Sequence, residues 1–205
     1  MMSSEICMSG KPQFDEASVV NAAMEVFWRH GYAASSIDQL TTAMGLSRSS
    51  LYKRFGDKDG LFREVLSTYT ERVLRRMNSV QAPTKREQLK ALLLEFLPKG
   101  ASRPRPPGCM LVRSCAEMTD LPVAGRTVAL EGLTQQRTIF SKILGEAVER
   151  GELAGEADVN GLAWHYLGIL QAIMTLPQAG ATAEEARRVV DLGLLAWPPV
   201  RPPKT

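Results

Sequence analysis

The stretch SSIDQLTTAMGLSRSSLYKRFGDK, residues 35–58, decides the fold expected of this chain. Ser36 is followed three residues later by Gln39, a capping-box pattern that predicts a helix from this point to about Met44. Gly45 then supplies a residue that takes positive φ without strain, which is how many helices end. The first half of the stretch therefore predicts one short, capped helix and a tight turn.

The second half of the stretch predicts another short helix. Leu46 follows the turn as an apolar plug, and Ser47 can cap a helix over residues 48–55. Asp57 is then placed to cap a further, longer helix. Two short helices joined by a tight turn are typical of a helix-turn-helix.

The residues of this motif separate into an inner and an outer face. Ile37, Leu40, Leu51 and Phe55 recur at helical spacing and should point inward. The residues left facing outward are cations, hydroxyls and one amphipathic ring: Arg48, Ser49, Ser50, Tyr52, Lys53 and Arg54. A short helix with such a face fits the major groove of DNA.

Net charge alone does not indicate a nucleic-acid partner, because the chain carries only +3 at pH 7. The placement of the charges is more informative. Four cations fall within an eleven-residue span in which Asp57 is the single acid: Arg48, Lys53, Arg54 and Lys58. Acids closer to the N-terminus belong to a different helix. This segregation of sign favours contact with DNA.

The remainder of the chain also reads as helices, and no segment is typical of a strand. A helix from Phe14 to Gly31 precedes the motif, and the helix capped by Asp57 should run to about Val80. Further helices are expected over residues 84–96, 109–118, 122–150, 158–176 and 182–197. The basic, proline-rich segment 98–108 is interpreted as a connector, with contact to DNA or a partner as the alternative.

The last two expected helices are the most apolar, and the short turn LPQAG joins them. They should pack as an antiparallel hairpin, which either closes the core or binds a second copy of the chain. The whole pattern predicts an all-α fold of about nine helices. We expect a flexible N-terminus at 1–12, a three-helix helix-turn-helix domain at 13–58, a larger helical domain at 59–198 and a tail at 199–205.

Several classes of protein are disfavoured. The N-terminus MMSSEICMSGK has no apolar core of a signal peptide, and no stretch approaches 18 uninterrupted apolar residues, so we expect a cytoplasmic protein without contact to a membrane. No nucleotide-binding, serine-hydrolase or metalloprotease motif is present, which makes an enzyme the weakest alternative. Two distant histidines and three cysteines without a CxxC spacing predict no metal or other cofactor.

Over residues 14–66 the chain resembles the tetracycline-repressor (TetR/AcrR) family of bacterial transcription regulators. The resemblance rests on AAMEVFWRHGY, on SSIDQLTTAMGLSRSSLYKRFGDKDGLF and on the spacing between them. GCMLVRSCAEM and GILQAIMTLPQAGATAEEARRVV resemble, less specifically, the C-terminal ligand and dimerisation domain of one subgroup. The resemblance implies a homodimer through the last two helices that reads a palindromic, double-stranded operator. It further implies a repressor that a small molecule releases from this DNA.

The resemblance also assigns roles to residues of the motif. Ser36, Tyr52 and Lys58 match positions that contact backbone phosphates. Arg54 stands where the family often has a histidine, a departure that keeps or strengthens a phosphate contact. Base reading falls to the start of the recognition helix, at Arg48, Ser49 and Ser50, with Lys53 as a further candidate.

The ligand pocket is expected among the middle helices of the second domain. Its candidates are Phe96, Met110, Leu111, Ser114, Met118, Trp164, His165 and Met174, although such residues are more often simply core. His165 is interpreted either as a hydrogen-bonded core histidine or as a polar hook for the ligand. Cys109 and Cys115 lie six residues apart and cannot pair within one helix, so thiol sensing would need one reactive cysteine or a bridge between subunits. A ligand-binding or thiol-sensing regulator that acts by another route is the alternative function.

Overall fold

The computed structural model describes residues 15–97, 106 and 108–198. These residues form nine α-helices and two short 3-10 helices, with no strand among them, which confirms the predicted all-α fold. The helices are α1 Glu16–His30, α2 Ile37–Met44, α3 Arg48–Phe55, α4 Lys58–Asn78, α5 Lys85–Glu95, α6 Met110–Ala116, α7 Val123–Glu149, α8 Val159–Thr175 and α9 Ala183–Gly193. The 3-10 helices are Leu176–Ala179 and Leu194–Ala196. The predicted N-terminus, the tail and most of the segment 98–108 lie outside the described residues.

Local capping explains where the helices of the motif begin and end. Ser36 Oγ accepts from the backbone N–H of Gln39 at 3.1 Å, and the Gln39 side chain accepts from the Ser36 N–H at 2.8 Å. Gly45 ends α2 at φ 64°, and Ser47 caps α3 by accepting from the N–H of Ser50. The predicted helix-turn-helix is therefore present with the predicted caps.

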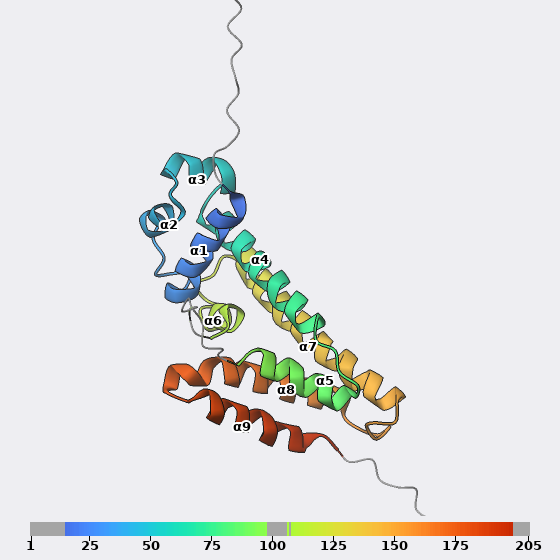
Figure 1. Cartoon of the computed structure of the whole chain (residues 1–205). Coiled ribbons are helices and arrows are strands. Elements are labelled where there is room, and N and C mark those ends of the chain that lie inside the picture. Colours follow the sequence, from blue (N-terminus) through green and yellow to red (C-terminus); the bar gives the residue numbers. More distant parts are fainter. Residues whose placement is uncertain (1–14, 98–105, 107, 199–205) are drawn as a thin grey trace, which may run out of the picture.

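The helices form two groups at opposite ends of the molecule, and a pair of long helices joins these groups. Helices α1, α2 and α3 form one end, and α5, α8 and α9 form the other, whereas α4 and α7 run side by side between them (Figure 1). Helix α6 lies below α1, close to the junction (Figure 1). Leu61, Val65 and Leu66 of α4 are fully buried, so one continuous apolar core connects the two ends.

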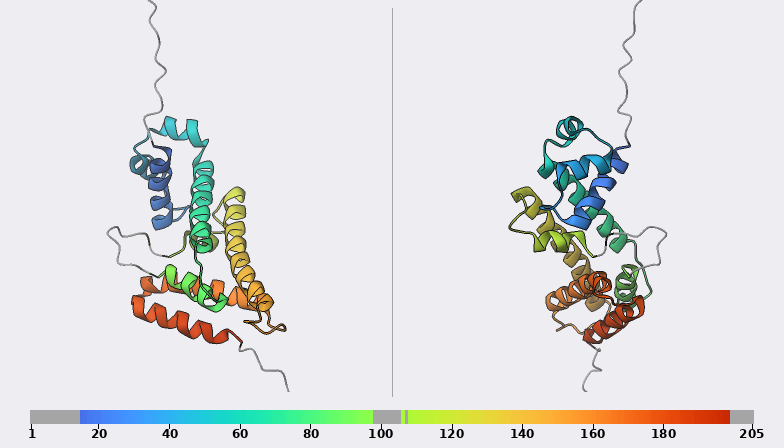
Figure 2. Two further views of the ribbon diagram at one scale, coloured as in Figure 1. Left: turned by 45° about the vertical axis from the view of Figure 1, so that its right-hand side comes forward. Right: turned by 90° about the vertical axis from the view of Figure 1, so that its left-hand side faces the viewer.

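Helices α8 and α9 form the predicted antiparallel hairpin at the end of the molecule opposite α3 (Figure 2). The 3-10 helix Leu176–Ala179 and Gly180 make the turn between them. Three large apolar side chains remain on the surface of this hairpin and the turn that follows it: Trp164, Leu192 and Leu195. Within the described part of the chain, no helix combines the length and apolar character needed to span a membrane.

Candidate nucleic-acid interface

Helix α3 lies at the far end of the molecule (Figure 1), and the side chains of its polar face are exposed. Leu51 is fully buried and holds α3 against the core. Tyr52 is 48% exposed, and Ser49, Ser50 and Lys53 are exposed beside it. The predicted outward residues therefore share one accessible surface, as a groove-binding helix requires.

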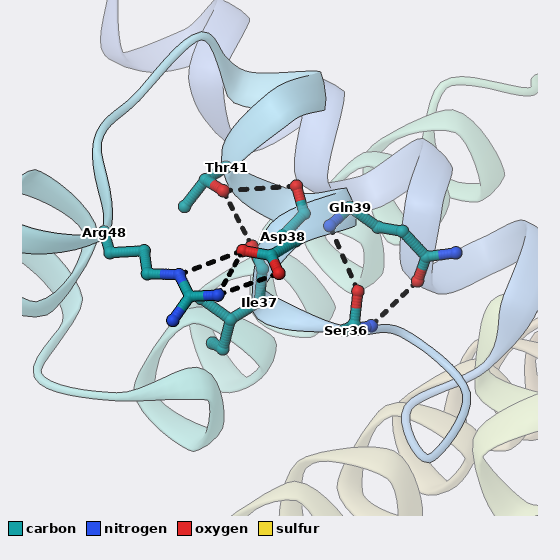
Figure 3. Close-up of polar contacts among 6 residues, drawn as sticks. All are labelled: Ser36, Ile37, Asp38, Gln39, Thr41 and Arg48. Carbon is teal, nitrogen blue, oxygen red and sulfur yellow. Dashed lines mark hydrogen bonds and ion pairs between the residues drawn. The ribbon is translucent and has the colours of Figure 1, made fainter.

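Arg48, at the start of α3, is held by a carboxylate of the preceding helix. Its Nε donates to Asp38 Oδ1 at 2.9 Å, and its Nη2 donates to Oδ1 at 2.6 Å and to Oδ2 at 2.8 Å (Figure 3). Both side chains stay about two-thirds exposed. The hydrogen bonds to Asp38 raise the pKa of Arg48, so its charge is secure. The predicted base-reading cation is thus accessible but already oriented.

Arg54, near the end of α3, has partners on two other helices. Its Nε donates to Glu16 of α1 at 3.2 Å, and its two terminal nitrogens donate to Glu64 of α4 at 3.2 and 3.1 Å. The guanidinium also stacks over the Phe55 ring. This geometry makes Arg54 a brace that fixes α3 against α1 and α4, and the phosphate contact predicted for it stays a prediction.

The remaining candidates are placed by their local partners. The hydroxyl of Ser36 belongs to the α2 cap, and Ser47 Oγ lies 2.9 Å from the hydroxyls of both Ser49 and Ser50. Lys58 lies with its Nζ 4.3 Å from the centre of the Tyr32 ring, and burial lowers its pKa. Lys58 is therefore tied to the turn that precedes α2.

The turn that precedes α2 is also in direct contact with the C-terminal end of α6. Glu117 Oε2 accepts from the backbone N–H of Tyr32 at 2.7 Å, and Tyr32 donates its hydroxyl to Asp59 of α4. Gly31 adopts φ 83°, and a β-carbon there would collide with the Glu117 carboxylate. A polar link therefore joins the C-terminal end of α6 to the helix-turn-helix.

The candidate ligand residues do not form one cluster with a single character. Phe96, Met110, Leu111 and Ser114 are buried, Met118, His165 and Met174 are half-buried, and Trp164 is 55% exposed. His165 Nε2 lies 3.0 Å from the carbonyl oxygen of Gly193, which connects α8 to α9. Arg137 stacks over the Trp164 ring at 4.7 Å on the surface. His165 thus has the partner expected of a core histidine, and Trp164 faces away from the buried candidates.

A chain of buried and half-buried polar residues, not singled out by the sequence, crosses the larger unit. We call Tyr69, Cys109, Gln136 and Gln171 the buried polar chain. The Tyr69 hydroxyl lies 3.6 Å from Cys109 Sγ, and Gln171 Nε2 donates to Gln136 Oε1 at 3.0 Å. Burial raises the pKa of the Cys109 thiol, and the nearby Tyr69 hydroxyl and Gln136 amide offset this only in part. The buried polar chain therefore connects α4, α7 and α8 with the N-terminal end of α6.

Gln136 Nε2 lies close to the Cys109 thiol but, like Gln171 Oε1, has no nitrogen or oxygen hydrogen-bond partner within the described residues. The hydroxyl of Tyr166 on α8 is a third such atom, and Trp28 Nε1 on α1 is a fourth. Leaving a buried polar group unpaired costs about 1–3 kcal/mol. The Trp28 ring of α1 packs edge-on against Tyr69, with ring centroids 5.0 Å apart. The buried polar chain is therefore in contact with α1, at the helix-turn-helix end of the molecule. One signal was available in the sequence, since Gln171 interrupts the apolar run GILQAIM.

Over the described residues the chain is all-helical and carries an exposed helix-turn-helix at one end, an arrangement typical of the class of helix-turn-helix DNA-binding regulators. Residues 19–65 match the model of the bacterial regulatory proteins of the tetR family, and residues 85–192 match that of the tetracyclin repressor-like C-terminal domain. The second match alone covers more than half of the chain. The chain therefore belongs to the TetR family of transcriptional regulators, and it is not an enzyme. This confirms the resemblance drawn from the helix-turn-helix.

Relatives and solved structures agree with this assignment. The HTH-type transcriptional repressor ComR of Escherichia coli (strain K12) is 29% identical over 195 residues, which cover 92% of each chain. An uncharacterised HTH-type regulator of Bacillus subtilis (strain 168), YezE, is 27% identical and covers 91% of this chain and 98% of its own. A cysteine-substituted variant of the TetR family regulator CifR, complexed with 26 bp double-strand operator DNA, superimposes with a TM-score of 0.79 at 28% identity, over 92% of this chain and all of its own. The chain is thus similar along most of its length to DNA-binding regulators.

Proposed function

We propose that this protein is a repressor that binds a palindromic operator and is released from it by a small molecule. The accessible polar face of α3, at the extreme end of the molecule, is the observation that supports this most directly. In this proposal Arg48, Ser49, Ser50 and Lys53 read bases, and Ser36, Tyr52 and Lys58 contact phosphates. Arg54 holds α3 in place. ComR is named a repressor, which supports the direction of regulation.

The proposed DNA-bound form is a homodimer built through α8 and α9. Trp164, Leu192 and Leu195 are large apolar side chains exposed at this end, which supports burial against a second copy. A two-fold pair of this kind presents one α3 to each half-site, so the operator should be palindromic. Binding to the chromosome also implies a cytoplasmic location.

The larger unit is proposed to hold the effector near the buried polar chain. A small molecule with a hydrogen-bond acceptor for Gln136 Nε2 and a donor for Gln171 Oε1 would satisfy both unpaired atoms. The link from Glu117 to the Tyr32 backbone then offers a route from α6 to the helix-turn-helix. We place the boundary between the two units near residue 58, at the start of α4. Because α4 is one continuous helix, its movement changes both units together.

Thiol sensing is the second candidate for the input signal. The neighbouring CifR structures are of cysteine-substituted variants, and Cys109 here lies within the buried polar chain. Burial raises the pKa of Cys109 and keeps it as a thiol, which is the less reactive form. The raised pKa favours a non-covalent effector.

Selection of bound duplexes from a pool of random sequence tests the proposed function. We expect enrichment of an inverted repeat whose half-site centres are separated by about one helical turn or a multiple of it. The variant Tyr52→Ala with Lys53→Ala is the matched control and should enrich nothing. Recovery of an unsymmetrical site, or of no common sequence, would contradict the proposal.

A further inference from the structure

We infer that Asp38 is a positioning residue for base recognition, which fixes the Arg48 guanidinium so that its free edge is offered to a guanine. The inference rests on the proposed function, because it assumes that α3 enters the major groove. It concerns a residue of α2 that has no place among the predicted DNA contacts, and it gives that residue a role in specificity.

The geometry of the ion pair defines which edge of Arg48 is free. A guanidinium has five N–H donors in a rigid plane. Asp38 accepts from Nε through Oδ1 and from Nη2 through both of its oxygens, so it occupies the edge of the group formed by these two nitrogens. The third nitrogen, Nη1, points away from Asp38 (Figure 3). The two N–H donors of Nη1 remain available, and N–H donors of arginine match the O6 and N7 acceptors of guanine.

The carboxylate comes from a helix that is itself fixed. Asp38 lies in the first turn of α2, which begins with the capping box of Ser36 and Gln39. A negative side chain is favoured at this position by the helix dipole. Leu40 is fully buried, and the Thr41 hydroxyl donates to the carbonyls of Ile37 and Asp38 at 2.9 and 3.1 Å (Figure 3). Asp38 is thus a rigid support for a side chain that would otherwise sample many rotamers.

The pair is poorly explained by fold stability. Arg48 and Asp38 are 64% and 69% exposed, and exposed ion pairs contribute about 0–1 kcal/mol. Asp38 also places a negative charge at the end of the molecule that approaches DNA, which weakens sequence-independent attraction to phosphates. A residue that lowers general affinity while it orients a base-reading cation increases discrimination. Its removal should therefore separate specificity from affinity.

Binding of Asp38→Asn to three kinds of duplex tests this inference. The duplexes are the selected operator, operators changed at one base pair at a time, and a scrambled sequence of the same composition. Wild type should bind the operator more tightly than the operator changed at one particular guanine of each half-site. In Asp38→Asn this ratio of affinities should be about tenfold smaller. Its affinity for the scrambled duplex should be unchanged or higher, with a slightly steeper salt dependence.

Two further variants distinguish positioning from a general effect. Arg48→Ala should lose discrimination at the same base pair, and adding Asp38→Asn to it should cause no further loss. Glu16→Gln is the matched control, because it removes another exposed carboxylate from an arginine of α3, that of Arg54. It should change affinity for all duplexes by a similar factor.

The outcomes separate this inference from the proposed function. Full discrimination in Asp38→Asn, or an equal loss of affinity for every duplex, would overturn the role of Asp38 and leave the repressor intact. Equal binding of all duplexes by the wild type would overturn the proposed function and this inference with it. A melting temperature of Asp38→Asn within a few degrees of wild type is expected, because the pair is exposed.

Discussion

The two ends of the molecule treat polar groups in opposite ways. At the α3 end, the exposed cations Arg48 and Arg54 are bound to carboxylates although water could solvate them. In the buried polar chain, Gln136 Nε2 and Gln171 Oε1 have no nitrogen or oxygen partner among the described residues, although burial makes this costly. Stability alone favours neither arrangement, since exposed ion pairs contribute little and unpaired buried groups cost about 1–3 kcal/mol each.

This difference indicates what each end is organised to do. Charges that are ordered in advance lose less side-chain entropy when a ligand docks, so the α3 end is prepared for a partner that is large and rigid. Unpaired groups inside a helical unit are satisfied by ordered water, by another bound molecule or by a rearrangement. The α3 end is therefore suited to a rigid contact surface, and we propose the buried polar chain as the place where the effector binds.

The largest expected effect concerns the exposed face of α3. Tyr52→Phe keeps the ring and removes only the hydroxyl, which is proposed to bind a phosphate. A hydrogen bond to a charged group contributes about 1.5–3 kcal/mol, and the proposed dimer loses two of them, so operator affinity should fall about 10²- to 10⁴-fold. Fluorescence anisotropy with a labelled operator measures the change. Unchanged affinity would remove Tyr52 from the interface, and the free energy of unfolding should stay as in wild type.

The next effect concerns Tyr166, whose buried hydroxyl has no hydrogen-bond partner in the part of the chain that the structure describes. Burial raises the pKa of Tyr166 to about 12, so the unfolded chain releases this proton from about pH 10 and the folded chain only near pH 12. The folded state binds more protons across this interval, and its stability falls as the pH rises through it, by about 2 kcal/mol from this group. In urea unfolding, Tyr166→Phe should lose less stability than wild type between pH 10 and 12. Parallel curves for the two proteins would contradict this, and Tyr52→Phe is the control with an exposed hydroxyl.

A smaller effect is expected from the glutamine pair of the buried polar chain. Replacing both partners by apolar side chains of similar length, Gln136→Met with Gln171→Met, should leave the free energy of unfolding unchanged or raise it by about 1 kcal/mol. Gln171→Met alone removes the hydrogen-bond donor to Gln136 Oε1 and should destabilise the protein. Gln135→Met, on the exposed side of α7, is the control. A double variant less stable than the single one would show that the pair serves the fold.

The smallest effect is expected from the ion pairs that Arg54 makes with its two carboxylate partners. Glu16→Gln removes one of its two carboxylates, and Glu64 remains. Exposed ion pairs contribute about 0–1 kcal/mol, so the melting temperature should fall by no more than a few degrees, and less in high salt. A loss of several kcal/mol would mean that α3 depends on Arg54 for its folding. Calorimetry at two salt concentrations distinguishes these results.

The helix-turn-helix could be predicted because its signals are local. Ser36, Gly45 and Ser47 act within three residues of themselves, and the caps they form are those expected. The partners of Arg54 could not be predicted, because Glu16 and Glu64 come from helices whose packing only the fold defines. The ends of the helices also depend on local signals, and those of the nine helices lie within a few residues of their predicted positions.

The buried polar chain was missed for a related reason. Gln135 and Gln136 are adjacent and chemically identical, yet only Gln136 is buried, and the sequence does not state which of them faces the core. Trp164 shows the opposite error. It is an aromatic residue in an apolar helix and was predicted among the buried candidates, but it is more than half exposed. Both cases depend on the rotation of long helices against each other, which periodicity fixes only coarsely.

The most direct test of the account is the ratio of affinities for the selected operator and for a scrambled duplex, measured by anisotropy across a series of salt concentrations. We predict that the operator binds at least about 10³-fold more tightly and that the logarithm of each binding constant falls linearly with the logarithm of salt concentration. A ratio near one at every salt concentration would contradict the claim that the exposed face of α3 reads sequence.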